Sequence, residues 1–279
     1  CSSDLPTKAG DRGGTRTVAQ QPAAAVWRAM ENHTTSLKFS IVTCTRNSAA
    51  TLAKTIDSVQ SQTGVKIEHV FVDGASNDAT LDLCRAVPGE KKTIEGVTGG
   101  ISKAMNRGVA EATGDIVAHL HSDDYYFSPR VLATVARHFE ESGCDWLFGR
   151  IVSDVDGQLQ PEPFVAPRFS WGRLLRGNFI PHPATFARRS VFERFGGFRE
   201  DYRLAMDYEY WLRITRHTKV CQLDEPLAVF RRHSGSASTS QWLAAFNEDM
   251  RARLAYAAWY EWPEHAARYA IRRLRRARA

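Results

Sequence analysis

The chain has 279 residues, of which 43% are hydrophobic and 24% are charged, a balance typical of a soluble globular protein with a substantial core. It contains no run of eighteen or more apolar residues, so no membrane-spanning helix is predicted. The five cysteines are odd in number and lack CxxC spacing, which argues against a disulfide framework and a structural zinc site. These features favour a protein of a reducing compartment.

The formal net charge of +6 favours an anionic partner, and six of the last twelve residues are arginines. No recognised nucleic-acid-binding motif accompanies them, so we expect no nucleic acid partner. Aromatic residues are interleaved with these arginines, at Trp259, Tyr260, Trp262 and Tyr269. Two interpretations remain open: a basic amphipathic helix on an anionic membrane surface, or a solvated charged helix.

Residues 1–36 have no sustained periodicity and are predicted to form a flexible leader. Strand and helix patterns then alternate along the chain. Strands are predicted at 38–44, 67–72 and 115–121, and helices at 48–62, 77–85 and 100–112. This alternation predicts an α/β fold with a mainly parallel central sheet and helices on both faces, where ligands gather at the carboxyl ends of the strands.

The pattern changes from about residue 145 onward. Shorter strands are predicted in 146–155, followed by a Pro-rich stretch and an aromatic-basic segment. Helices are predicted at 190–195 and 206–216, the second with Trp211, Leu212 and Ile214 facing inward. From Trp242 to the end the propensity is helical, with a break near Pro263.

Acidic residues stand at three element boundaries: Asp73, the pair Asp123-Asp124, and Asp207. A single aspartate after a strand is typical of a turn or a helix cap, so none of these positions is diagnostic alone. Two adjacent carboxylates repel each other unless a cation or hydrogen-bond donors offset their charge. Carboxylates together with substrate phosphates are the ligands that Mg²⁺ or Mn²⁺ prefers, so the pair indicates a diphosphate site.

Five segments occur in a specific order between residues 38 and 240: SIVTCTRN, HVFVDGASNDAT, GGISKAMNRGVAEATGDIVAHLHSDD, HPATFARRSVFERFGGF and MDYEYWLR. Together they resemble family 2 glycosyltransferases of the bacterial surface-polysaccharide type. The resemblance implies a Rossmann-like GT-A domain over 37–240, with a nucleotide-sugar half at about 37–125 and an acceptor half at about 126–240. A C-terminal basic amphipathic helical tail is expected at 241–279.

The resemblance implies an inverting glycosyltransferase of the hexosyl or N-acetylhexosaminyl type. Its donor would be a nucleotide-diphosphate sugar, expected to be a UDP-sugar, and its acceptor a hydroxyl of a glycan or a lipid-linked sugar in cell-surface glycan biosynthesis. Asp124 is implied as the direct ligand of Mg²⁺ or Mn²⁺, assisted by Asp123. The residues implied in nucleotide-sugar binding are Thr45, Arg46, Asn47, Asp73, Gly100, Asn106, Arg107 and Asp123.

Asp207 matches the family's general base, which removes the proton of the acceptor hydroxyl. Contacts to the leaving group or acceptor are expected from His182, Tyr208, Arg231, Arg232 and His233. We expect Tyr208 and Trp171 to be partly exposed. Two positions depart from the family pattern: Lys103, where many relatives carry an acid, and His121, which replaces the first acid of an Asp-x-Asp motif.

Other interpretations explain less of the sequence. A sugar nucleotidyltransferase needs a Gly/Arg/Lys-rich phosphate loop after the first strand, and TRNSAAT is not one. A non-catalytic nucleotide-sugar-binding module would not need Asp207. A zinc site built from His119, His121 and His182 is disfavoured because the family uses aspartates here.

We expect a cytoplasmic enzyme, with the C-terminal tail as a peripheral contact to the inner face of the membrane. Cys1 followed by two serines fits a processed lipid-anchored start, but the cytoplasmic supply of nucleotide sugars disfavours that origin. Met30 is an alternative start of the chain.

Overall fold

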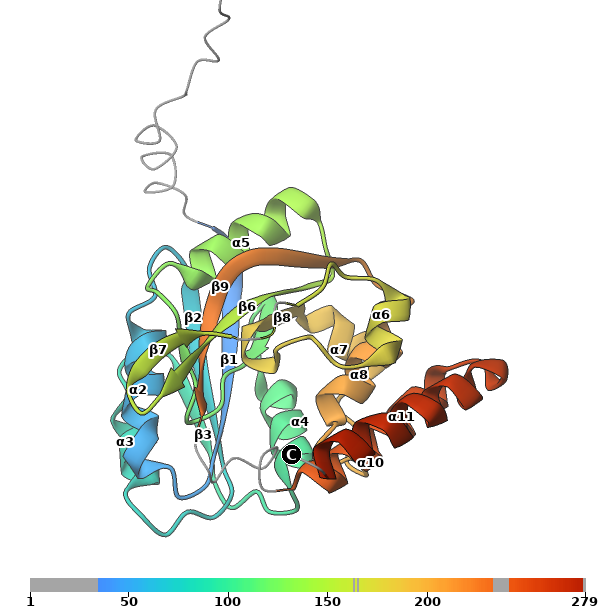
Figure 1. Cartoon of the computed structure of the whole chain (residues 1–279). Helices are drawn as coiled ribbons and strands as arrows, with labels where there is room; N and C mark the ends of the chain where they lie inside the picture. Colours follow the sequence, from blue (N-terminus) through green and yellow to red (C-terminus); the bar gives the residue numbers. More distant parts are fainter. Residues whose placement is uncertain (1–34, 163, 165, 233–240, 278–279) are drawn as a thin grey trace, which may run out of the picture. The chain divides into compact units, whose positions relative to one another are not determined.

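The computed structural model describes residues 35–162, 164, 166–232 and 241–277 (Figure 1). The described strands form one sheet in the order β3-β2-β1-β4-β8-β6-β9-β5, with β7 paired to β6. The strands are β1 (Lys38–Thr45), β2 (Lys66–Asp73), β3 (Lys91–Ile94), β4 (Ile116–His119), β5 (Tyr125–Tyr126), β6 (Trp146–Val155), β7 (Gln158–Pro161), β8 (Thr185–Arg188) and β9 (Val220–Arg232).

The described helices lie between and after these strands. The α-helices are α2 (Ala49–Gln60), α3 (Thr80–Ala86), α4 (Ile101–Glu111), α5 (Val131–Ser142), α6 (Trp171–Arg176), α7 (Arg189–Phe195), α8 (Met206–Thr215), α10 (Trp242–Tyr256) and α11 (Trp262–Ala277). Two short 3₁₀ helices are η1 (His182–Ala184) and η2 (Trp259–Glu261). No described helix combines the length and the apolar character needed to cross a bilayer.

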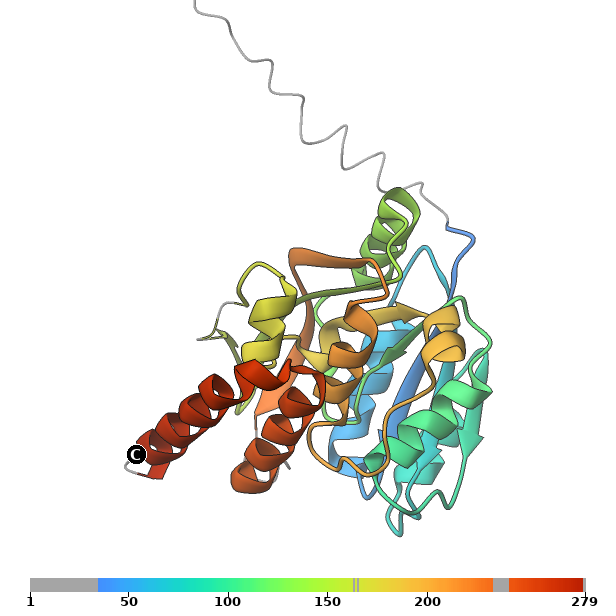
Figure 2. The same cartoon turned by 90° about the vertical axis from the view of Figure 1, so that its right-hand side faces the viewer.

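The first half of the sheet is parallel, as predicted, because β3, β2, β1 and β4 all run in one direction. Alternate residues of β1 face opposite sides of the sheet. Phe39 and Ile41 pack in a cluster with residues of α5, whereas Val42 and Cys44 pack in a cluster with residues of α4. The prediction of helices on both faces is therefore confirmed (Figure 2).

The second half of the sheet mixes directions. Strand β8 is antiparallel to both β4 and β6, and β6 is parallel to β9. Shorter strands were predicted in residues 146–155, but this segment forms one strand of ten residues, β6. The register of β6 with β9 shifts on both sides of Arg150. At Gly149 a Cβ would come within 2.5 Å of the Leu227 side chain, so the close approach of β9 requires glycine there.

The C-terminal helices pack on the second half. Helix α10 contacts α8 and α6, and α11 contacts α10. The α-helical conformation stops after Tyr256 and resumes at Trp262, so the predicted break near Pro263 is confirmed. Pro263 is the second residue of α11, where its missing N–H does not interrupt a helical hydrogen bond. The inward-facing residues predicted for α8, Trp211, Leu212 and Ile214, are all buried.

Candidate functional site

The carboxyl ends of β1 and β2 bring Thr45 beside Asp73, which are paired in register. The Thr45 hydroxyl donates to Oδ1 of Asp73 at 3.0 Å, and the Ser76 N–H donates to Oδ2 at 2.8 Å. The Ser76 hydroxyl also donates to Asp73, at 2.5 Å. Asp73 is fully buried, so these bonds fix its carboxylate at the floor of the site.

Two loops after these strands hold each other in place. The Asn47 N–H donates to the Ser76 hydroxyl at 2.9 Å, and Oδ1 of Asn47 accepts from the Asn77 N–H at 2.9 Å. Asn47 and Ala75 have left-handed backbones, with φ of 50° and 64°. For alanine this conformation costs about 1 kcal/mol, which the interlocked loops must offset.

A cavity of about 220 Å³ opens above these loops. It is lined by Cys44, Thr45, Arg46, Gly74, Val97, Thr98, Gly99, Gly100, Ile101 and Ala104. Three residues predicted to bind a nucleotide, Thr45, Arg46 and Gly100, thus lie together. Helix α4 begins at this cavity, and its first N–H groups favour an anion. Gly99 and Gly100 have φ near +108°, a conformation that glycine readily adopts.

Asn106 and Arg107 do not line this cavity. Both side-chain groups of Asn106 bond to the backbone of Phe198, its Oδ1 accepting at 2.7 Å and its Nδ2 donating at 2.8 Å. Arg107 is exposed and pairs with Glu111 at 2.8 Å. Each residue of an α-helix turns by 100°, so Asn106 points away from the face that carries Ile101 and Ala104, whereas Arg107 lies one turn beyond Ala104 and farther from the helix N-terminus where the cavity opens. Their expected placement in the cavity wall was wrong.

The pair Asp123-Asp124 follows β4 and a short turn. Asp124 is only 2% exposed, and its Oδ1 accepts the Arg231 N–H at 3.2 Å. Burial, reinforced by the charge of Asp123, raises the pKa of the Asp124 carboxyl well above its usual range. A buried carboxyl with so little compensation fits a site that binds a cation.

Among the described residues there is no group of three or more His, Cys, Asp or Glu side chains that could hold a metal ion by themselves. A Mg²⁺ or Mn²⁺ ion at Asp123 and Asp124 would therefore take its other ligands from water and substrate phosphates, as is usual for Mg²⁺. His119, His121 and His182 do not form such a group.

Those three histidines stack beside the acidic pair. The ring centroid of His182 lies 5.5 Å from that of His119 and 5.3 Å from that of His121. Burial lowers the pKa of His182 well below its usual range, so its ring is neutral. Neither of its nitrogens has a hydrogen-bond partner among the described residues. Since its ring also lies 6.2 Å from Trp211 of α8, His182 stands between the acidic pair and that helix.

Asp207 is the second residue of α8, and its side chain is partly exposed. Its Oδ1 accepts the Tyr208 N–H at 2.7 Å, and its Oδ2 accepts Nδ2 of Asn178 at 3.2 Å. Burial raises the pKa of Asp207 to about 6. The carboxylate of Glu248 on α10 accepts the backbone N–H groups of residues 203–205, which holds the loop just before Asp207.

Tyr208 is fully buried, and its hydroxyl donates to the Leu174 carbonyl at 2.7 Å. The expected partial exposure of Tyr208 was wrong, because the residue lies on the inner face of α8 and its ring cannot stack on a sugar. Trp171 is partly exposed, as predicted, with the Arg216 guanidinium 5.4 Å from its ring.

Arg231 and Arg232 are the last two residues of β9. The backbone of Arg231 reaches Asp124, whereas the Arg232 guanidinium pairs with Glu162 at 2.8 Å and donates to the Ser153 hydroxyl at 2.7 Å. His233 lies outside the described residues.

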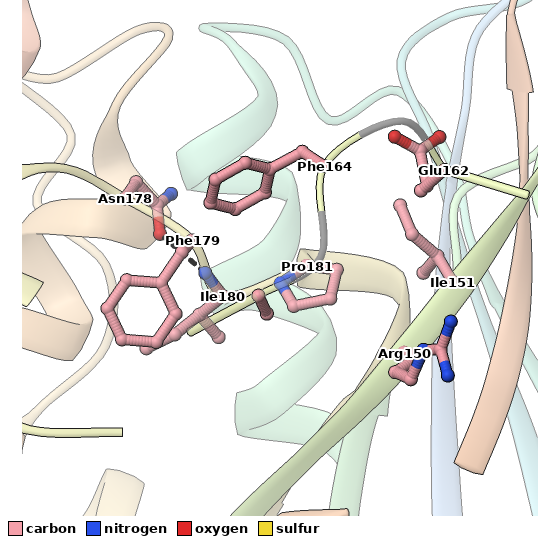
Figure 3. Close-up of a pocket in the computed structure, with 9 residues that line it drawn as sticks. Arg150, Ile151, Glu162, Phe164, Asn178, Phe179, Ile180 and Pro181 are labelled. Carbon is pink, nitrogen blue, oxygen red and sulfur yellow. Dashed lines mark hydrogen bonds between the residues drawn. The ribbon is translucent and has the colours of Figure 1, made fainter. Parts of the chain in front are cut away.

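A second cavity, of about 190 Å³, lies on the Asn178 side of Asp207. Figure 3 shows the rings of Phe164 and Phe179 on one side of it and the polar groups of Arg150 and Glu162 on the other. Asn178 lines this cavity and donates to Asp207. The sequence interpretation missed Asn178, whose only signal is its place shortly before the Pro181-His182 motif.

Comparisons with known proteins identify the family and the fold of the chain. The sequence pattern of the family described as Glycosyl transferase family 2 matches residues 40–196. An uncharacterized glycosyltransferase of Mycobacterium tuberculosis is 33% identical over 215 residues, which cover 68% of this chain and 79% of that protein.

Two solved structures share the fold. S. aureus TarS 1–349, in complex with UDP-GlcNAc, matches with a TM-score of 0.64 and 21% identity, over 84% of this chain and 71% of that one. The chain spans 39% of a longer TarS chain. A mannosyltransferase from Pyrobaculum calidifontis, in complex with GDP-Man and Mn²⁺, matches with a TM-score of 0.56 and 18% identity, over 90% and 82% of the two chains. These structures agree with the predicted GT-A fold.

Proposed function

The chain belongs to glycosyl transferase family 2, and from this premise we propose an inverting enzyme that transfers a sugar from a UDP-sugar to an acceptor hydroxyl. One observation carries the proposal: the chain combines a cavity at a helix N-terminus, an acidic pair of which Asp124 is buried, and a separate, partly exposed aspartate of raised pKa. The choice of UDP is supported by the structural likeness to TarS, which was solved with UDP-GlcNAc.

The 220 Å³ cavity would take the nucleotide. Asp73, fixed by Thr45 and Ser76, would accept hydrogen bonds from the base or the ribose. The N-terminus of α4 and the exposed Arg46 guanidinium would attract the phosphates, because both present positive charge to the cavity.

Asp123 and Asp124 would hold a Mg²⁺ or Mn²⁺ ion, which when bound supplies positive charge to the leaving diphosphate. The raised pKa of Asp124 supports this assignment, since a nearby cation would return the buried carboxyl to its ionised form. The neutral His182, whose nitrogens lack partners among the described residues, would give or accept one hydrogen bond at the reacting groups.

Asp207 would act as the general base. A carboxyl with a pKa of about 6 is mostly ionised at pH 7 and still more basic than an ordinary aspartate, which suits proton removal from a sugar hydroxyl. Asn178 would orient it through the bond to Oδ2. Attack by this hydroxyl opposite the leaving diphosphate inverts the anomeric carbon.

The acceptor would be a glycan or lipid-linked sugar of the cell surface, bound in the cavity beside Asn178, where Phe164 and Phe179 offer apolar ring surface. Helix α11 and the preceding turn expose aromatic side chains, Trp259, Tyr260 and Trp262, next to a row of arginines. We propose that this segment lies on an anionic membrane at its cytoplasmic face, which would bring a lipid-linked acceptor to the site.

The test is nucleotide release from a panel of UDP-, GDP- and dTDP-sugars, with and without Mn²⁺, for wild type and Asp207→Asn. We expect metal-dependent transfer or hydrolysis of a UDP-sugar that is lost in the variant. Donor binding without turnover under any acceptor condition would indicate a non-catalytic binding module instead. A chain that binds none of the donors calorimetrically would overturn the proposal.

A further inference from the structure

A third cavity, of about 420 Å³, lies between α6, α10 and α11 and is rich in arginine. It shares Phe164, Asn178 and Phe179 with the acceptor cavity of Figure 3, but it shares no lining residue with the 220 Å³ cavity. Its lining is Phe164, Pro167, Arg173, Arg176, Gly177, Asn178, Phe179, Asp249, Arg253 and Arg272. Four guanidinium groups thus surround one space.

The positive charge of this cavity is only partly offset. Asp249 is its one lining carboxylate, and it lies 3.5 Å from a guanidinium nitrogen of Arg253. Burial raises the pKa of Asp249 to about 6. Arg176 has a distant partner, Glu264, at 3.8 Å, which also pairs with Arg268. Cations gathered around a cavity with one lining carboxylate favour an anionic ligand.

Two of the guanidinium groups converge over the backbone of Gly177. A Cβ at Gly177 would lie 3.5 Å from Nη1 of Arg272 and 3.9 Å from Nη2 of Arg253. Arg253 is only 1% exposed, and the Tyr208 hydroxyl 3.3 Å from its Nε holds its fork in place. A planar fork that is fixed in advance is suited to bidentate binding of phosphate oxygens.

The arginine cavity also adjoins the reacting centre. Asn178 lines it and donates to Asp207 at 3.2 Å, so an anion bound among the arginines would lie one side chain away from the base. We propose that this cavity binds a phosphate or diphosphate group of the acceptor, and so positions the acceptor hydroxyl at Asp207. This inference rests on the proposed function, because it assigns the acceptor to a phosphate-bearing class.

Adjacent arginines on α11 provide a matched pair of variants. Both side chains are exposed, but Arg272 lines the cavity and Arg273 does not. Arg272→Gln and Arg273→Gln each remove one charge from the same helix, so they weaken attraction to an anionic membrane equally. The probe is inorganic pyrophosphate, titrated calorimetrically with EDTA present so that no metal bridges it to the aspartates. Binding of UDP is measured in the same samples.

We expect Arg272→Gln to raise the Kd for pyrophosphate about tenfold or more, the typical effect of losing one charge-assisted contact, and Arg273→Gln to leave it unchanged. Equal losses in both variants, or no binding to wild type, would overturn the inference. The two measurements test different proposals. Failure to bind UDP would contradict the proposed function, whereas the pyrophosphate titration tests only the arginine cavity. Thermal unfolding of both variants controls for folding.

A second arm identifies the source of the phosphate. Neutral phosphatidylcholine vesicles carrying a polyprenyl phosphate are sedimented with wild type and the two variants. Binding lost in Arg272→Gln and kept in Arg273→Gln would assign the phosphate to a lipid carrier. The same pattern with pyrophosphate but not with vesicles would assign it to a soluble glycan phosphate. Either pattern supports the cavity, and equal behaviour of the two variants in both arms contradicts it.

Discussion

Two buried carboxyl groups near opposite ends of the parallel strands, those of Glu68 and Asp124, have pKa values shifted in opposite directions. Near the amino ends, the fully buried Glu68 accepts hydrogen bonds from Ser40, from the N–H and hydroxyl of Thr113, and from the Gly114 N–H at 3.2 Å. Burial alone would raise its pKa, but these bonds and the charge of Lys38 lower the pKa of Glu68 to about 2. Its charge is satisfied within the fold.

At the carboxyl ends, Asp124 is almost as deeply buried, but burial and the charge of Asp123 raise its pKa. The same contrast occurs within α8. Glu209 is fully buried, pairs with Arg213 at 3.1 Å and accepts the Tyr256 hydroxyl, whereas Asp207, two residues earlier, is partly exposed and has a raised pKa. Apart from Asp73, whose hydrogen bonds fix it within the site, carboxyl groups satisfied by the protein hold the fold, and those left for a ligand mark the site.

The largest expected effect separates the two acids of α8. Asp207→Asn removes the proposed base and should lower kcat about a thousandfold, within the range typical of general bases, while thermal stability stays close to that of wild type. Glu209→Gln should instead lower the Tm, because it breaks a buried ion pair. Transfer assays and thermal unfolding of both variants measure this; a Glu209→Gln enzyme as inactive as Asp207→Asn, but fully stable, would contradict the contrast.

Glu68→Gln tests the amino end. The folded-state pKa of about 2 lies below the ordinary value of 4.5, so ionised Glu68 stabilises the fold above about pH 4.5, and this contribution is lost as the pH falls toward 2. The shift corresponds to about 3 kcal/mol, and we expect Glu68→Gln to lose roughly that much stability at pH 7. Denaturant unfolding at pH 7 and pH 3 measures it. A loss that is as large at pH 3 as at pH 7 would show that the charge is not its cause.

The pH dependence of transfer tests the carboxyl end. Because the base must be ionised and the pKa of Asp207 is about 6, kcat/KM should fall about tenfold per pH unit below 6. Profiles between pH 5 and pH 8 measure this, with the fold monitored by circular dichroism. Activity that stays constant down to pH 5 would exclude Asp207 as a base with a raised pKa.

The smallest effect concerns Asn178, a positioning residue. Asn178→Ala removes the hydrogen bond that stabilises ionised Asp207, so the acidic limb of the profile should move to higher pH, and kcat should fall about fivefold. A purely structural role would lower the Tm without moving the limb. The exposed Asn247→Ala on α10, which loses only a hydrogen bond from Tyr269 of α11, is the control and should not move the limb.

Local patterns in the sequence predicted the first half of the molecule well. The strand ends at Thr45 and Asp73 follow from short apolar runs, and parallel pairing brings those ends together without further information. The predictions were wrong at helical positions, where the rotation of the helix decides which way a side chain points. Asn106 turned away from the cavity and Tyr208 turned into the core, because each residue of a helix changes its direction by 100°.

The arginine cavity could not be predicted from the sequence. Arg173 and Arg176 are on α6, whereas Arg253 and Arg272 are on α10 and α11, so they meet only through the packing of three helices. In the sequence, Arg272 is indistinguishable from its neighbour Arg273. Only the fold shows which of them faces the reacting centre.

The most direct test of the central claim, that the carboxyl ends are left for a metal and a diphosphate, is the affinity for UDP with and without Mn²⁺ in wild type and Asp124→Asn. The account predicts that Mn²⁺ strengthens UDP binding at least about tenfold in wild type and has no effect in Asp124→Asn, whose amide oxygen can still accept the Arg231 N–H. The account would be contradicted if Mn²⁺ did not change the UDP affinity of wild type, or if it raised the UDP affinity of Asp124→Asn by the same factor.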